Sequence, residues 1–167
     1  MKAVIQCVSE CSMTSNGAFH AKIGRGMLVL LGIAVGDTPR EAEILCDRII
    51  KLRIFRDEAD KMNLPIGKMN TGSDNTAGDI LIVPNFTLYA DCKKSRRPDF
   101  FGAARPEAAK PLFDYFTFCL GDYAKSFAFR EGGGTARVLT GVFGADMKIT
   151  LTNDGPVTII LDTEELC

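Results

Sequence analysis

The segment Pro84-Asn85-Phe86-Thr87 carries a hydroxyl group, on Thr87, of the kind that binds or orients a substrate. Pro84 has no backbone N–H, so it interrupts a strand and leaves unpaired backbone groups beside that hydroxyl. Unpaired N–H and C=O groups at such an interruption can shape the polar corner of a pocket. The alternative is that Thr87 is a strand residue selected for its β-propensity. From the segment alone, both interpretations stay open.

A second segment, from Lys93 to Pro98, concentrates positive charge in a chain whose net charge is −1. Such a local concentration attracts phosphate groups, although a solvated basic loop has the same composition. The small net charge argues against a general polyanion binder and restricts any nucleic-acid contact to a local patch. The four cations of this basic cluster are Lys93, Lys94, Arg96 and Arg97.

Two further segments combine glycine with residues that can line a pocket. Phe143 and Met147 flank a tight Gly-Ala-Asp connection, where they either face one pocket or pack in the core. Gly155 and Pro156 stand beside the apolar run 159–161, which is typical of a strand. Glycine and proline in such a place indicate an edge, a bulge or a close backbone approach, or else a turn that begins the last strand.

The chain lacks the parts of the common nucleophilic hydrolases. A side-chain nucleophile needs a base beside it, and the single histidine, His20, lies in a predicted loop near the N-terminus. No GxSxG elbow, Walker loop or GxGxxG segment precedes a predicted helix. His20 has no cysteine or carboxylate at metal-ligand spacing, so we expect neither a metal nor another cofactor. An enzyme of this composition would work by positioning and by backbone groups.

The elements that position these residues are readable from local signals. Asn16-Gly17 predicts a hairpin turn, and Thr38-Pro39-Arg40-Glu41 predicts a capped helix start. A second helix is expected to begin near Pro106 and run through Cys119. Residues 78–90 have strand character interrupted at Pro84-Asn85, and 56–78 form a polar excursion loop. Further strands are expected at 2–8, 26–35, 136–143, 146–152 and 157–161.

Composition indicates one globular α/β domain over residues 1–167. Hydrophobic residues make up 46% and charged residues 25% of the chain, both ordinary values for globular proteins. No apolar stretch reaches the length of a membrane span, and the N-terminus has no signal-peptide pattern. The six cysteines form no CxxC pair, which is typical of reduced thiols in a cytoplasmic protein.

Longer motifs give a resemblance to a known family. The segments MKAVIQ, GMLVLLGIAVGDT, KLRIFRD, FTLYAD, RRPDF, TGVFGADMKI and NDGPVTIILD occur in this order through nearly the whole chain. Together they resemble the D-aminoacyl-tRNA deacylase family. The resemblance implies a single three-layer α/β domain with a strongly curved, mostly antiparallel or mixed sheet and two main helices. It also implies a homodimer that hydrolyses the ester between a D-amino acid and tRNA and removes glycine mischarged onto tRNA.

The same resemblance assigns roles to the segments described above. Gly155-Pro156 corresponds to the family's chirality gate, a cis step that enters the partner subunit's active site. Its backbone carbonyls exclude the side chain of an L-amino acid by steric clash. Thr87 and Phe86 match the catalytic position, where backbone N–H groups form an oxyanion hole and the 2′-OH of the terminal adenosine assists water. The resemblance places Pro84, Asn85, Ala103, Phe143 and Met147 around the substrate, and the acceptor-stem phosphates against Lys93, Lys94, Arg96 and Arg97.

Two departures from the family pattern leave alternatives open. Pro84-Asn85 stands where the family has Ser-Gln, and Cys7 stands where an arginine braces the Gly-Pro loop. A sister branch with proline at the serine position carries a trans Gly-Pro step and removes L-alanine mischarged onto a threonine tRNA. Because other relatives are linked to DNA replication, a non-catalytic tRNA- or DNA-binding protein is a further alternative. D-specific deacylation is the function that Phe86 and the sequence after Gly155 favour.

Overall fold

The structure, a computed structural model, describes residues 1–69, 77–93 and 96–166. Its first strands, β1 (Lys2–Ser15) and β2 (Ala18–Ile23), form the hairpin that the sequence predicts. Asn16 and Gly17 both have positive φ, 50° and 81°, as a two-residue hairpin turn of the favoured hand requires. The turn therefore fixes the pairing of the two strands from local sequence alone.

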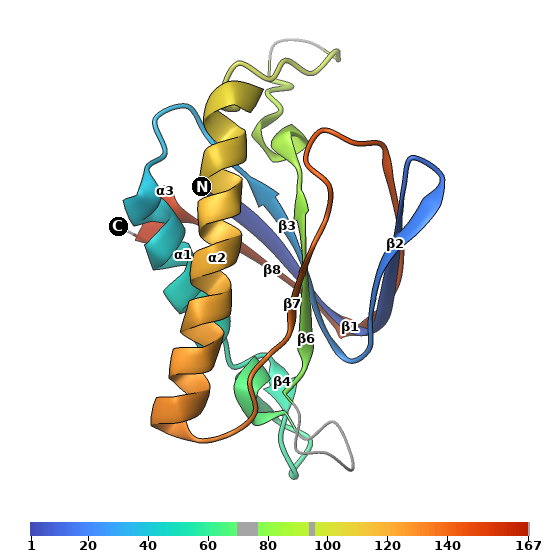
Figure 1. The fold of residues 1–167 in the computed structure, drawn as a ribbon, viewed down its shortest axis with the longest axis vertical. Helices are drawn as coiled ribbons and strands as arrows, with labels where there is room; N and C mark the ends of the chain where they lie inside the picture. Colours follow the sequence, from blue (N-terminus) through green and yellow to red (C-terminus); the bar gives the residue numbers. More distant parts are fainter. Residues whose placement is uncertain (70–76, 94–95, 167) are drawn as a thin grey trace.

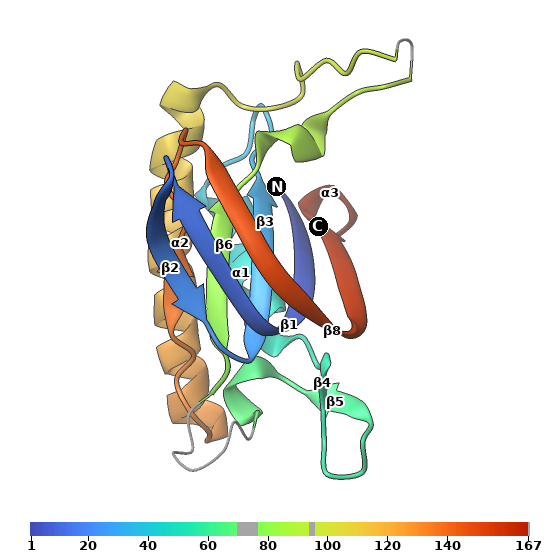
Figure 2. The ribbon, with the colours of Figure 1, turned by 90° about the vertical axis from the view of Figure 1, so that its right-hand side faces the viewer.

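The sheet contains both antiparallel and parallel pairs. It is strongly curved because β1 is long and pairs with three strands. Residues 2–8 of β1 pair antiparallel with β3 (Gly26–Gly32), and residues 11–15 pair antiparallel with β2. Beyond β3, the strands β6 (Asp79–Pro84) and β7 (Val138–Thr140) continue the sheet in parallel. The last strand, β8 (Met147–Asp162), follows both halves of β1 and bends with it (Figures 1 and 2). The expected fold class is confirmed.

Two long helices, α1 (Pro39–Lys51) and α2 (Pro106–Glu131), form a layer on one side of the sheet, as Figure 1 shows. Thr38 and Glu41 make the predicted capping box, and hydrogen bonds from the Thr38 side chain and backbone lower the pKa of the Glu41 carboxyl. α2 is longer than predicted, since Leu120 and Ala124 continue its buried stripe beyond Cys119. The short helix α3 (Thr163–Leu166) ends the described chain.

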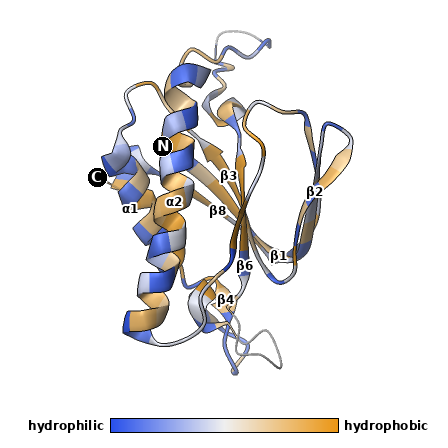
Figure 3. Cartoon of the chain, in the orientation of Figure 1, coloured by the Kyte–Doolittle hydropathy of each residue, from blue (hydrophilic) through white to orange (hydrophobic). Residues whose placement is uncertain are grey.

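Among the described residues, the core consists of two apolar clusters. One lies between the helices and the β3–β6 part of the sheet and includes Leu45, Ile49, Phe113 and Phe116. The second cluster lies inside the curve of the sheet. In Figure 3 the strands β3, β6 and β8 behind α2 are coloured largely as hydrophobic, and α2 carries both hydrophobic and hydrophilic residues on its visible face. The second cluster consists of Val8, Cys11, Met13, Ala21, Ile23, Leu28, Leu81 and Val83.

The described part of the 56–78 excursion is ordered, which the prediction of a loop did not foresee. It begins at the second residue of β4 (Phe55–Arg56) and contains β5 (Met62–Leu64) and a 3-10 turn, η1 (Ile66–Lys68). The Asp57 carboxylate accepts hydrogen bonds from the Ala59 and Lys61 amides and from the Asn63 side chain, and these bonds lower its pKa. Residues 70–76 lie outside the described residues. Among those described, no helix is long and apolar enough to cross a membrane.

Four of the expected strands differ in detail from the structure. The strands expected at 146–152 and 157–161 are one strand, β8, because both pair with β1 on either side of an irregular stretch. Strand character ends at Pro84, and η2 (Phe86–Tyr89) follows as a 3-10 helix because the Asn85 side chain caps it. The strand expected at 136–143 is β7, whose pairing with β6 covers only three residues.

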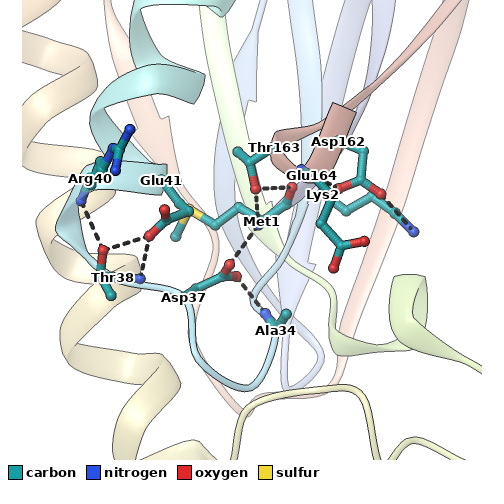
Figure 4. Close-up of polar contacts among 10 residues, drawn as sticks. All are labelled: Met1, Lys2, Ala34, Asp37, Thr38, Arg40, Glu41, Asp162, Thr163 and Glu164. Carbon is teal, nitrogen blue, oxygen red and sulfur yellow. Dashed lines mark hydrogen bonds and ion pairs between the residues drawn. The ribbon is translucent and has the colours of Figure 1, made fainter. Parts of the chain in front are cut away.

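The two ends of the described chain meet in a buried polar network (Figure 4). The Met1 amino group donates to Asp37 Oδ1 at 2.7 Å and to the Thr163 hydroxyl. Asp37 Oδ2 accepts from the Ala34 amide at 2.6 Å, and the side chain of Asp37 is only 8% exposed. The Met1 amino group, just ahead of β1, therefore joins Thr163 at the start of α3 to Asp37 in the segment that follows β3.

We expect Asp37→Ala to lower the free energy of unfolding by about 3–5 kcal/mol, because it leaves a buried ammonium group without its counter-ion. Urea denaturation followed by circular dichroism measures this loss. Asp114→Ala is the matched control, since the Lys110–Asp114 pair is 57% and 58% exposed and should contribute less than about 1 kcal/mol. Equal small losses in the two variants would show that the Asp37 network is not stabilising.

Candidate active site

A cavity of about 490 Å³ lies where β3 and β6 end, beside the start of α2 and the connection between β7 and β8. Apolar side chains make up most of its wall, with few polar groups among them, as is usual for small-ligand sites. Six of the residues predicted from the sequence line it together: Pro84, Asn85, Phe86, Ala103, Phe143 and Met147. The remainder of the wall comes from Leu31, Ile33, Phe100, Ala104, Arg105, Pro106, Ala109, Gly144 and Ala145.

The polar corner of this cavity is built at the end of β6. Pro84 is the last residue of β6 to pair with β3, and the Asn85 amide then donates to the Leu31 carbonyl at 2.7 Å. Asn85 is the N-cap of η2, where its Oδ1 accepts from the Thr87 amide at 3.3 Å and from the Thr87 hydroxyl. The Thr87 hydroxyl thus donates its hydrogen bond to Asn85, and its oxygen lone pairs remain able to accept a hydrogen bond.

Thr87 itself is exposed and is not part of the cavity wall, whereas its neighbour Phe86 is. Phe86 is the first residue of η2, a position at which a helix leaves its amide N–H without an intrahelical partner. The alternative interpretation of Thr87 as a strand residue is wrong, because the segment after Asn85 is helical. The cavity wall therefore includes Phe86, whose amide has no intrahelical partner, and the hydroxyl that Asn85 holds belongs to the next residue.

Aromatic pairs and a backbone bridge hold the cavity wall. The Phe86 and Phe100 rings meet edge to face with centroids 5.1 Å apart, and the Phe113 and Phe143 centroids are 6.0 Å apart. The Ala104 amide donates to the Ile33 carbonyl at 2.9 Å, next to the bridge between Ala34 and Ala103. These contacts place a residue from the segment before α2 against the end of β3.

The basic cluster lies on a hairpin that leaves the cavity wall after Phe86 and returns at Phe100. Asp91 and Asp99 pair through two backbone hydrogen bonds of 2.9 and 3.1 Å, and Asp91 Oδ1 also accepts from the Lys93 amide at 2.8 Å. Figure 2 shows this hairpin projecting from the body of the molecule. Lys93, Arg96 and Arg97 are exposed, and Lys94 lies outside the described residues.

Gly155 and Pro156 lie inside β8, so the interpretation of this step as a turn before the last strand is wrong. Both residues are exposed, and the peptide bond between them is cis. They are also far from the cavity of their own chain. Asn153, just before them, pairs with Val8, which pairs in turn with Gly26 at the first residue of β3. The cavity lies at the other end of that strand.

Comparison with known proteins identifies the family. The model of the D-Tyr-tRNA(Tyr) deacylase family matches residues 4–162. The chain belongs to this family. A D-aminoacyl-tRNA deacylase of Geobacter sulfurreducens is 46% identical over 164 residues, covering 98% of this chain and 96% of the relative. One of Chlorobium limicola is 44% identical over 165 residues, covering 99% of both chains. The expectation of a hydrolase of the D-aminoacyl-tRNA deacylase type is confirmed.

Two solved structures extend the comparison to the fold. A c-Myc DNA unwinding element binding protein has a TM-score of 0.79 and 36% identity, with 97% of this chain and 98% of that chain covered. A probable eukaryotic D-amino acid tRNA deacylase has a TM-score of 0.73 and 18% identity, with 96% and 97% covered. The second likeness bears on the fold alone, and it agrees with the curved sheet and two main helices of this deacylase-family chain.

Cys7 does not replace the arginine that braces the Gly-Pro loop in the pattern of this deacylase family. Its side chain is buried, and its thiol donates to the Ile54 carbonyl at an Sγ–O distance of 3.7 Å. Burial, and secondarily the nearby Asp154 carboxylate, raises the pKa of the Cys7 thiol to about 11. The thiol is therefore neutral at physiological pH and belongs to the core.

Of the nine lining residues that the sequence analysis did not predict, Phe100 and Arg105 have the largest side chains. Phe100 ends the RRPDF segment, where an aromatic residue three positions after the last arginine of the basic cluster was a readable signal. Arg105 precedes Pro106 as the N-cap of α2 and is exposed at the cavity. Among the described residues, no group of three or more histidine, cysteine or carboxylate side chains is arranged to hold a metal ion.

Proposed function

We propose that this chain hydrolyses the ester bond of D-aminoacyl-tRNA, and of glycine mischarged onto tRNA, as a proofreading step of translation. The observation that carries the proposal is the gathering of Pro84, Asn85, Phe86, Ala103, Phe143 and Met147 around one apolar cavity in a member of this family. Because aminoacyl-tRNA is the substrate of translation, we place this activity in the cytoplasm.

In this proposal the cavity takes the terminal adenosine, and the reacting ester lies at its polar corner. Phe143, Met147 and Ala103 contact the adenosine, while the Phe86 amide stabilises the oxyanion. The Thr87 hydroxyl, held by Asn85, accepts a hydrogen bond from the substrate. No side-chain base is required, since the 2′-OH of the adenosine assists water. The water oxygen forms a bond to the ester carbonyl carbon and gives up one proton. The bond between that carbon and the ribose oxygen breaks, and the ribose oxygen takes up a proton.

Stereoselectivity in this proposal comes from a second subunit. Gly155 and Pro156 are exposed and lie at the other end of β3 from the cavity of their own chain, which supports a role at the cavity of another chain. A homodimer would place their carbonyl oxygens near the substrate α-carbon. An L-side chain would clash with those oxygens, whereas a D-side chain or a glycine hydrogen would not. Light scattering at micromolar concentration tests this arrangement, because a monomer could not form the gate.

The basic hairpin supplies the contact with the tRNA backbone. Lys93, Arg96 and Arg97 are exposed on a hairpin that leaves and re-enters the cavity wall, and Lys94 lies between them in the sequence. Phosphate contacts of this kind make binding strongly dependent on salt. Charge-neutralising variants of the cluster should weaken tRNA binding and flatten its salt dependence while leaving the cavity intact.

The function is tested by the loss of ester from matched D-tyrosyl-tRNA and L-tyrosyl-tRNA, with L-alanyl-tRNA alongside. Rapid loss of the D-ester alone supports the proposal. Removal of L-alanine is the second candidate, favoured by Pro84 at the end of β6, and loss of the L-alanyl ester would establish it. Loss of no ester would indicate a binding protein without catalysis.

We expect Thr87→Ala to lower the rate constant of D-tyrosyl-tRNA hydrolysis at least tenfold in single-turnover assays. The reason is that the variant removes the hydroxyl that Asn85 holds and that, in this proposal, accepts a hydrogen bond from the substrate. Thr117→Ala is the matched control, since the Thr117 hydroxyl only donates to the Asp114 carbonyl within α2. An unchanged rate in the Thr87 variant would remove this residue from the mechanism.

A further inference from the structure

The Gly155-Pro156 step lies in a wide bulge of β8. Asn153 pairs with Val8 and Thr158 pairs with Gln6, so the four residues 154–157 stand opposite the single residue Cys7. A stretch of this length has no ladder hydrogen bonds of its own to hold its shape. Pro156 also lacks an N–H with which to bond the neighbouring strand. The conformation of residues 154–157 therefore depends on contacts from elsewhere.

One side chain spans the base of this bulge. Asn153 Oδ1 accepts a hydrogen bond from the Val157 amide at 2.9 Å, which closes the four-residue stretch into a loop. Asn153 Nδ2 donates to the Thr158 hydroxyl oxygen at 3.3 Å, on the far side of the bulge. A single side-chain amide thus holds both residues that follow Gly155-Pro156.

The orientation of the Asn153 amide is fixed in turn by β1. The Thr158 hydroxyl oxygen also accepts from Gln6 Nε2 at 3.2 Å, so it receives two donors. With that oxygen in place, the Nδ2 side of Asn153 faces Thr158, which turns Oδ1 toward the Val157 amide. Cys7, the residue of β1 beneath the bulge, directs its thiol to Ile54 instead.

We propose that Asn153 is the positioning residue that aims the carbonyl groups of Gly155 and Pro156, and that Thr158 and Gln6 fix the orientation of its amide. This inference rests on the proposed function, in which those carbonyls exclude L-amino acids. Asn153 acts through the backbone of the bulge and does not contact the substrate. Its loss is therefore expressed as a loss of stereoselectivity.

The test compares Asn153→Ala with Asn153→Asp in the whole chain, as the homodimer of the proposed function. The alanine variant removes the acceptor for the Val157 amide, and we expect the ratio of D- to L-tyrosyl-tRNA hydrolysis to fall at least tenfold. The aspartate variant keeps that acceptor, so it should retain most of the selectivity. Thr152→Ala, at the neighbouring exposed position of β8, should leave the ratio unchanged.

Hydrogen exchange of the Val157 amide provides a readout that is independent of catalysis. We expect this amide to be protected in the parent and in Asn153→Asp, and to exchange much faster in a folded Asn153→Ala variant. Unchanged protection and unchanged selectivity in the alanine variant would overturn the proposal. If the parent hydrolyses no ester, the proposed function fails, while the exchange experiment still decides whether Asn153 holds the bulge. If Asn153→Ala does not fold, loss of protection in Asn153→Asp would overturn the proposal.

Discussion

An Ala103→Phe variant is expected to lose at least a hundredfold in kcat/KM for D-tyrosyl-tRNA, equivalent to about 2.7 kcal/mol of transition-state stabilisation. Ala103 is half-buried on the wall of the cavity, and its backbone is held by the bridge to Ala34. The added phenyl ring would occupy the cavity instead of pushing into packed core. Single-turnover deacylation measures the loss, and thermal unfolding should show Tm little changed.

The control for this variant is Ala108→Phe. Ala108 is exposed in the first turn of α2, a few residues from Ala103, and does not line the cavity. The same increase in side-chain size there should leave kcat/KM unchanged. Full activity in both variants would mean that the substrate binds elsewhere, and the cavity would lose its assignment.

A Gly155→Ala variant should lose most of its discrimination between D- and L-esters while remaining folded. Gly155 has φ of 137°, a conformation that L-residues rarely adopt. A Cβ atom there would lie 2.9 Å from the Val157 nitrogen and 2.7 Å from its Cγ2 atom. The backbone of the bulge has to shift, and the carbonyl of Gly155 shifts with it. The ratio of D- to L-tyrosyl-tRNA hydrolysis should fall by more than tenfold.

Gly121→Ala is the matched control for that variant. Gly121 lies in α2, and a Cβ atom there would meet nothing within 4 Å. Alanine is the better helix former by about 1 kcal/mol, so this variant should unfold at a slightly higher temperature with unchanged stereoselectivity. Selectivity that survives Gly155→Ala intact would mean that the bulge takes no part in excluding L-amino acids.

Local signals predicted the parts of the fold that local chemistry decides. The Asn16-Gly17 turn and the Thr38–Glu41 capping box are made by neighbouring residues, so the sequence alone sufficed. The joining of 146–152 and 157–161 into β8 depends on a shared partner, β1, which no local pattern names. Asn85 was a readable N-cap signal, but strand propensity on both sides of Pro84 hid the 3-10 helix.

The candidate site was less accessible to sequence reasoning than the fold. Phe143 and Met147 were readable as a possible pair around one pocket, but only the family resemblance added Ala103, because it lies in a separate segment before α2. Arg105 was missed for the same reason, since the bridge between Ala34 and Ala103 is a tertiary contact. The hydrogen bonds of Asn153 across the bulge likewise depend on the register of β8 against β1.

The bulge of β8 also bears on how this fold can evolve. Strand pairing with β1 stops at Asn153 and resumes at Thr158, and each half of β8 is held by its own stretch of β1. Residues 154–157 can therefore be lengthened, shortened or exchanged without moving the sheet on either side. Substitutions, insertions or deletions within residues 154–157 could therefore change the substrate preference while the sheet keeps its structure. Grafting inserts of different length between Asn153 and Thr158 would measure how far that independence extends.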